Sequence, residues 1–260
     1  MICLETVAFE LKGKFAFFKK PDVNSKIYFT YSHIHKIALL GLLGSILGYG
    51  GYTQQYEAIR EAGTNKDNQY PEFYQCLKHL NVAIVPHGDC GYFAKKIQSF
   101  NNSVGYASRE EGGNLIVREQ WLENPHWTIY LFKNNEMDTT VFENLKRAII
   151  HRQSVYVPYL GKNDHMAVID NPRVCESTLI RDVHEINSLY YEIPGIIFDD
   201  FADPPENSSF YYFEEMMPWK LDPKLNYYKF RTVCLTNKFI ESIPRKSVFY
   251  KTEGKTLALL

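Results

Sequence analysis

An α+β fold is predicted for this 260-residue chain by three observations. Several stretches alternate apolar and polar residues, which is the pattern of half-buried β-strands. Two longer stretches repeat apolar residues at helical spacing and lie between those strands. The last ninety residues contain no long helical pattern and are rich in tyrosine, phenylalanine, proline and acidic residues. Helices and strands therefore share the first part of the chain, and strands dominate the rest.

The first strand and the first helix are predicted within the first fifty residues. Residues 7–11 alternate in hydrophobicity, so they are expected to form a half-buried strand. Ser32 is a suitable N-cap for a helix that runs to about Leu47, because its hydroxyl can accept a hydrogen bond from a free backbone N–H. Gly48 is expected at the C-terminal end of this helix, where the left-handed conformation is common.

The next segments complete a recurring order of strands and helices. Residues 72–80 read as a short helix and residues 81–86 as the second strand. Residues 126–133 alternate as a third strand, and a second long helix is expected from an N-cap at Asp138. Residues 154–161 read as the fourth strand. The order strand, helix, strand, strand, helix, strand is that of a ferredoxin-like, split βαβ fold of the RRM type.

Two regions lie outside this ferredoxin-like core. We expect residues 1–170 to form the ferredoxin-like domain and residues 171–260 to form a smaller, mostly β extension. Residues 87–123 form a long, polar, glycine-bearing insertion between the second and third strands. A long loop in a compact domain is usually functional or disordered. This insertion is therefore a candidate for function.

Composition and charge narrow the class of protein. Apolar residues make up 45% of the chain and aromatic residues 15%, as in a globular protein. The five cysteines form no CxxC pair, which favours a reducing cytoplasm over a disulfide scaffold or a zinc ribbon. Residues 11–36 contain six lysines and one acid, whereas residues 182–222 contain ten acids and one lysine. Either a basic face for a polyanion and an acidic face for a protein partner, or ordinary solvated surfaces, would give this separation.

A charge-free, glycine-rich run at residues 37–52 raises the question of what this segment contacts. It is too short for a membrane span, and it lacks a GxxxxGK[ST] phosphate loop. On a helix, Gly41, Gly44 and Gly48 share one face, and each interior glycine costs up to about 1 kcal/mol relative to alanine. Such a helix must gain from a close approach, either of the protein sheet beneath it or of an RNA backbone.

Two groups of cations favour an RNA backbone over the protein sheet as the partner of this helix. His33, His35 and Lys36 are expected in the first turn, where positive charge opposes the helix dipole and a bound phosphate would reverse the penalty. A second group lies just upstream and interleaves lysines with three phenylalanines. Cations that pair with phosphates and rings that stack on bases suit a single strand. The cations of this second group are Lys14, Lys19 and Lys20.

Four ordered motifs resemble the Cas-five family of CRISPR-associated proteins, and its type I-B branch in particular. The similarity covers residues 4–170 and extends more loosely to the end of the chain. The motifs are GKFAFFKKPDVN, TYSHIHKIALLGLLGSILGYGGY, IVREQWLENPHWTIYL and VYVPYLGKND. The resemblance implies a cytoplasmic subunit of the crRNA-guided surveillance complex (Cascade), with a RAMP-type ferredoxin-like core and a hairpin thumb. Such subunits grip the 5′ handle of crRNA and cap the filament of backbone subunits beside the large subunit, and they support recognition of target DNA through the complex.

The resemblance also places family features on this chain. The basic residue that opens the family's glycine helix falls on Lys36, whereas a second basic position holds Leu40 here. The thumb falls on residues 87–123, with Tyr92, Phe93 and Tyr106 as possible wedges. The RNA-binding residues expected from the sequence and the resemblance together are Lys14, Lys19, Lys20, His33, His35, Lys36, Gly41, Gly44, Ser45, Gly48, Tyr49, Lys95, Lys96, Arg109 and Arg118.

An enzymatic alternative comes from the type I-C branch of the same family, in which the equivalent subunit is a metal-independent endoribonuclease that processes precursor crRNA. Such cleavage needs a general base and a general acid, typically His, Lys or Tyr. Candidates are Tyr49 and Tyr52 after the glycine helix, and the adjacent pair Lys78 and His79. The adjacent pair reads more readily as the end of a helix, and the I-B branch leaves cleavage to a separate nuclease.

We therefore expect a non-catalytic RNA-binding subunit with no cofactor, no metal and no membrane segment. Lys162 and His165, which follow the PYLG turn, contact RNA or simply face water on this reading. A ferredoxin-like domain with some other partner remains the third class.

Overall fold

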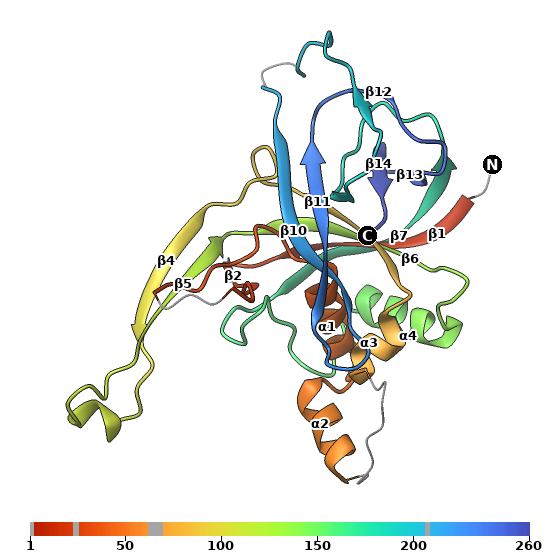
Figure 1. Ribbon diagram of the computed structural model, residues 1–260. Helices are drawn as coiled ribbons and strands as arrows, with labels where there is room; N and C mark the ends of the chain where they lie inside the picture. Colours follow the sequence, from red (N-terminus) through yellow and green to blue (C-terminus); the bar gives the residue numbers. More distant parts are fainter. Residues whose placement is uncertain (1–2, 23–25, 62–69, 206–208) are drawn as a thin grey trace.

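A six-stranded antiparallel sheet forms the centre of the computed structural model, which describes residues 3–22, 26–61, 70–205 and 209–260 (Figure 1). Alternate residues of β1 and β6 pack on opposite faces of the sheet, and both faces are covered. The strands lie in the order β14 (Lys255–Ala258), β13 (Phe249–Thr252), β7 (Val168–Ile180), β1 (Cys3–Lys12), β6 (His126–Phe132) and β3 (Asn81–Pro86).

Helices cover one face of this sheet. α1 (Lys36–Leu47) contacts α3 (Glu72–Leu77) and α4 (Thr139–Ile150), and all three lie on the same side of the sheet in Figure 1. α2 (Tyr52–Glu61), which the sequence reading missed, contains no buried residue and extends away from the body. No helix in the described part of the chain is long and apolar enough to cross a lipid bilayer.

The predicted caps fit α4 and the end of α1 but not the start of α1. Asp138 accepts a hydrogen bond from the N–H of Val141 at 3.0 Å and begins α4, as predicted. Gly48 ends α1 in the left-handed conformation with φ of +80°. The expected N-cap at Ser32 is wrong, because α1 begins four residues later. The Ser32 hydroxyl instead accepts a hydrogen bond from the Lys95 amine at 2.9 Å.

The expected fourth strand at residues 154–161 is also wrong. This segment makes no strand and instead closes the C-terminal end of α1. The N–H of Val155 donates to the carbonyl of Ile46 at 3.0 Å, and the N–H of Tyr156 donates to the carbonyl of Ser45 at 3.1 Å. The last carbonyls of a helix have no intrahelical donors, and the N–H groups of Val155 and Tyr156 supply two. The strand that follows α4 in the central sheet is β7.

The C-terminal third is mostly β, but it is continuous with the central sheet. β7 crosses the boundary expected at residue 170, and β13 and β14 extend the same sheet. The division at residue 170 stays a prediction, and within residues 171–260 the rest of β7 together with β13 and β14 belongs to the central sheet. The remaining C-terminal strands form two small sheets and are β8 (Tyr190–Tyr191), β9 (Ile197–Phe198), β10 (Tyr212–Leu221), β11 (Tyr228–Thr236) and β12 (Ile240–Ser242).

A long hairpin projects from the body within the insertion expected at residues 87–123 (Figure 1). β4 (Lys95–Asn101) and β5 (Ile116–Glu123) form its two strands, and β2 (Phe15–Ala16) adds a third at the root. A short 3-10 helix, η1 (Ala107–Arg109), lies near its tip. β2 and β5 pair through Phe15 and Glu123, so the N-terminal lysine-rich segment meets the hairpin root.

Candidate nucleic-acid interface

The start of α1 is enclosed by aromatic rings. His35 is buried, and its Nδ1 accepts a hydrogen bond from the N–H of Ala38 at 3.2 Å. The rings of Phe18, Tyr31 and Tyr228 surround it edge-on, at 5.3–6.2 Å between ring centroids. Burial lowers the pKa of His35 to about 3, so the imidazole is uncharged at neutral pH. His35 therefore acts as a cap and carries no charge for a phosphate.

His33 is equally enclosed. Its Nδ1 accepts a 3.4 Å hydrogen bond from Nε1 of Trp127, and its ring packs edge-on against Phe93 and Phe213. Burial, and then the charge of Lys95, lowers the pKa of His33 to about 3. Phe93, expected as a possible wedge, is itself buried in this cluster.

Lys36 points into the protein. Its amine donates a 2.8 Å hydrogen bond to the backbone carbonyl oxygen of Leu260, and burial lowers its pKa to about 8. The expectation of an open, cationic end on α1, formed by His33, His35 and Lys36, is therefore wrong. None of these three side chains reaches the surface as a free cation, because aromatic rings and the last residue of the described chain cover that helix end.

The three glycines of α1 have three different surroundings. A Cβ added at Gly44 would overlap the Cβ of Phe73, so this glycine allows α3 to pack closely on α1. Gly48 has positive φ, and its added Cβ would lie 3.0 Å from Val155. At Gly41 the nearest atom to an added Cβ is Cε2 of Phe73 at 3.9 Å, which is an ordinary contact. Only Gly41 leaves open space beside the helix.

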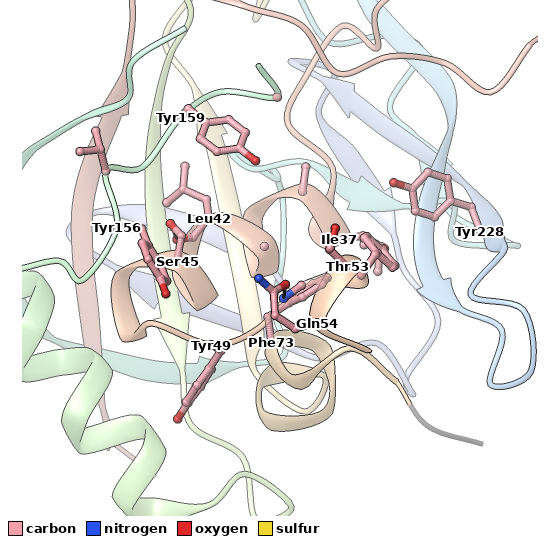
Figure 2. Close-up of a pocket in the computed structure, with 16 residues that line it drawn as sticks. Ile37, Leu42, Ser45, Tyr49, Thr53, Gln54, Phe73, Tyr156, Tyr159 and Tyr228 are labelled. Carbon is pink, nitrogen blue, oxygen red and sulfur yellow. Dashed lines mark hydrogen bonds between the residues drawn. The ribbon is translucent and has the colours of Figure 1, made fainter. Parts of the chain in front are cut away.

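That space is a cavity of about 700 Å³, which we call the tyrosine groove (Figure 2). α1 contributes Gly41 and Ser45 to its floor. Figure 2 shows Tyr159 and Tyr228 on opposite sides with their hydroxyls directed inward, whereas Tyr49 points away from them. None of the described residues that line the groove carries a charge. Five tyrosines line it: Tyr49, Tyr52, Tyr156, Tyr159 and Tyr228.

Two of the expected cations are tied into the fold. The Lys20 amine lies 2.6 Å from a carboxylate oxygen of Glu215, whose other oxygen accepts a hydrogen bond from the N–H of Ser32 at 2.9 Å. Lys95 donates to the hydroxyl of Ser32, and burial lowers its pKa. Lys20 and Lys95 therefore connect the N-terminal segment, the hairpin root and β10, and neither is a freely exposed cation.

One face of the hairpin root combines half-buried rings with lysines. The rings are Phe15, Phe100 and Trp121, and we call this surface the hairpin face. The amine of Lys14 lies 5.6 Å from the Phe15 centroid and that of Lys96 lies 5.8 Å from it. The amine of Lys162 lies 4.8 Å from the Phe100 centroid and 5.4 Å from that of Trp121. Rings alternating with cations suit a single-stranded polyanion.

A buried carboxylate holds two side chains of the hairpin face together. Glu119 is only 8% exposed and accepts 2.8 Å hydrogen bonds from both Nε1 of Trp121 and Nζ of Lys162. His165 is buried beside them, edge-on to Trp121 at 4.5 Å. In the described chain neither of its ring nitrogens has a hydrogen-bond partner, and burial lowers its pKa. The hydrogen bond from Lys162 to Glu119 thus holds the segment after Gly161 against the hairpin.

The remaining expected cations are exposed but spread over the surface. The Lys19 amine lies 3.8 Å from the Tyr28 centroid. Arg118 pairs in register with Ser99, whereas Trp121 pairs with Lys96, so Arg118 lies on the opposite face of the hairpin from Trp121. Arg109 lies in η1 near Tyr106, which is 77% exposed.

The residues proposed for nuclease chemistry fall into two separate groups, because Tyr49 and Tyr52 line the tyrosine groove whereas Lys78 and His79 do not. The Nδ1 atom of His79 lies 2.6 Å from a carboxylate oxygen of Glu136, and Lys78 ends α3 with its amine over Tyr70. Tyr52 lines the tyrosine groove, but Lys78 and His79 are not among the residues that line it. No group of three His, Cys, Asp or Glu side chains in the described ranges gathers as a metal ion would require.

These features define an α+β protein with mostly antiparallel sheets and a projecting basic, aromatic hairpin. No family model and no curated protein matches the chain. A crystal structure of a CRISPR protein from Archaeoglobus fulgidus is similar to it, with a TM-score of 0.50 and 11% identity over 98% of each chain. A chain of a CRISPR RNA-guided surveillance complex aligns over 91% of this chain and 92% of its own length, at 12% identity. Its TM-score of 0.47 is too low to support a conclusion, and the first likeness establishes the fold alone.

Proposed function

We propose that this chain is a non-catalytic subunit of a type I-B CRISPR surveillance complex that binds the 5′ handle of crRNA along the hairpin face. The observation that carries the proposal is the alternation of Phe15, Phe100 and Trp121 with lysines. Base stacking on such rings contributes about 1–3 kcal/mol per base, and the lysines can pair with phosphates. The lysines available to phosphates are Lys14 and Lys96, whereas Lys162 is paired with the buried Glu119 and holds the face together.

The arrangement of the core supports this assignment. The order β7-β1-β6-β3, with α1 between β1 and β3 and α4 between β6 and β7, has the connectivity of a ferredoxin-like domain. The projecting β4–β5 hairpin, which lies within residues 87–123, supports the proposal that this insertion is the thumb that the resemblance to the Cas-five family implies. The fold shared with a CRISPR protein is consistent with this connectivity and with the hairpin.

The proposed partners follow from this place in the complex. The chain would hold the crRNA handle, cap the filament of backbone subunits and contact the large subunit, and it would meet target DNA only through the assembly. It would act in the cytoplasm in antiviral defence. Co-purification of the full chain with the products of its neighbouring genes tests these partners. Recovery without backbone subunit and crRNA would contradict the assignment.

The binding role is favoured over cleavage because Lys78 and His79 lie outside the groove that Tyr49 and Tyr52 line. The lining of the tyrosine groove holds tyrosine hydroxyls but no histidine, lysine or carboxylate among its described residues. Labelled repeat RNA incubated with the purified chain in EDTA separates the two functions. We expect retention of the RNA without a cut. A single defined cut would identify a metal-independent endoribonuclease instead.

A further inference from the structure

The tyrosine groove has the form of a ligand site, and we propose that it holds one unpaired nucleobase of the RNA bound along the hairpin face. This inference rests on the proposed function and adds a base-binding site to it. The groove lies beside Gly41, where the missing side chain leaves the helix surface open. Its volume of about 700 Å³ falls in the range of small-molecule sites. Tyr159 and Tyr228 supply aromatic walls from segments far apart in the sequence (Figure 2).

The chemistry of the lining selects a base and not a phosphate. A phosphate needs cations or convergent N–H groups, whereas the described lining residues are uncharged. A base is flat, neutral and polarisable, and it stacks on aromatic rings. Burial raises the pKa of Tyr52 and of Tyr228, so both hydroxyls keep their protons and remain donors at neutral pH.

Polar groups in the groove match the mixed edge of a base. The Ser45 hydroxyl donates to the carbonyl of Leu42 at 2.7 Å, which leaves its lone pairs as acceptors. Oε1 of Gln54 accepts a 3.0 Å hydrogen bond from the N–H of Gly51, so its amide nitrogen remains as a donor. Donor and acceptor groups within one aromatic site can read the Watson–Crick edge of an unpaired base.

One segment of the chain also joins the groove lining to the hairpin face. Gly161 lines the groove with φ of +85°, and a Cβ there would overlap the carbonyl oxygen of Phe17. This close approach lays the segment flat on the chain that leads from β2. The next residue, Lys162, reaches Glu119 beneath Trp121. An RNA strand on the hairpin face would thus lie one residue of chain from the groove lining, which favours a base of that strand over a peptide as the occupant.

Gly41→Leu offers a direct test, because its Cβ would make only an ordinary 3.9 Å contact with Phe73 and the rest of the side chain would extend into the groove. The probe is a fluorescently labelled single-stranded RNA with the sequence of the repeat, together with versions that lack one base at a time. With the wild-type chain, we expect loss of one particular base to weaken binding about tenfold, as for one stacked base. Gly41→Leu should weaken binding of the intact RNA by a similar factor and make loss of that base neutral.

Two further variants keep the test decisive. Thr140→Ala, at an exposed position of α4 outside the groove, is the control and should bind like the wild type. Tyr159→Ala removes an exposed wall and should reproduce the loss in Gly41→Leu even if the latter folds poorly. The proposal is overturned if the wild type binds RNA but tolerates the loss of every base, or if both groove variants keep full affinity.

Other outcomes identify what else has failed. If Gly41→Leu binds RNA normally but no longer co-purifies with the backbone subunit, the groove is a protein-docking site and the proposed base site is wrong. If the wild-type chain binds no RNA in any form, the proposed function itself fails, and the base site fails with it.

Discussion

The side-chain amine of Lys36 donates a 2.8 Å hydrogen bond to the backbone carbonyl of Leu260, 224 residues away in sequence. This contact turns the only lysine of α1 toward the interior and joins the start of the helix to the end of the chain. A buried amine that keeps its charge needs such an acceptor, and here burial already lowers its pKa. Lys36 therefore belongs to the fold and not to a phosphate site.

Substitution of Lys36 tests this assignment. Lys36→Met should change the free energy of unfolding by no more than about 1–2 kcal/mol, because it removes a hydrogen bond together with a buried charge. Lys36→Glu places a carboxylate against a carbonyl and should cost about 3 kcal/mol or more. Urea unfolding measures both. The Met variant should keep the wild-type salt dependence of RNA binding, and a reduced salt slope would place Lys36 at a phosphate after all.

Two of the buried histidines, His33 and His35, predict a loss of stability in acid. Their pKa values are about 3 in the folded chain against 6.5 as the ordinary value. The unfolded state thus binds more protons between these values, so stability falls as the pH drops from about 6.5 toward 3. By pH 4 the loss should reach a few kcal/mol for each histidine.

The His35→Asn variant provides the matched control for this pH dependence. Asparagine can still cap the helix but does not titrate. Near pH 5 the slope of unfolding free energy against pH should fall by about 1.4 kcal/mol per pH unit, the value for one proton. A wild-type curve that is flat between pH 7 and pH 4 would mean that the histidines are not buried as described.

Alanine at Gly41 and at Gly44 should act in opposite directions. Gly41→Ala meets only one ordinary contact and improves helix propensity, so it should stabilise the protein by up to about 1 kcal/mol. Gly44→Ala would overlap Phe73 and should destabilise it by about 1–3 kcal/mol through displacement of α3. Thermal unfolding of the two variants and the wild type measures both changes in stability. Equal effects would contradict the close packing of α1 on α3.

Several elements could be predicted from sequence because their cause is local. The strand at residues 81–86 and the Asp138 cap follow from alternation and from one side chain accepting a nearby N–H. The segment at 154–161 could not, since an extended apolar run looks the same whether its N–H groups meet a strand or the end of a helix. Only the tertiary contact to Ile46 and Ser45 distinguishes the two.

The candidate site was harder to predict than the fold, because it depends more on contacts between residues far apart in sequence. Lys20 and Lys96 look alike in sequence, yet one is held by Glu215 from β10 and the other remains exposed on the hairpin. Tyr228 enters the tyrosine groove from β11, and no local pattern points there.

The contrast between these two lysines gives another prediction. Lys96→Gln should reduce the slope of log affinity against log salt for single-stranded RNA by about 0.7, the value for one phosphate contact. Lys20→Gln should leave that slope unchanged and lower stability instead, because it breaks the pair with Glu215. Fluorescence titrations at several salt concentrations measure the slopes. A larger change for Lys20 than for Lys96 would move the interface away from the hairpin face.

Both ends of α1 are sealed, one by His35 and its ring of aromatic side chains and the other by Gly48 and the N–H groups of Val155 and Tyr156. The helix therefore meets any ligand as a rigid, preorganised rod, since no turn has to form or unwind. Ligand binding beside Gly41 should therefore reduce the conformational entropy of the protein very little. Affinity there would depend on shape and on the loss of ligand motion, and not on induced folding.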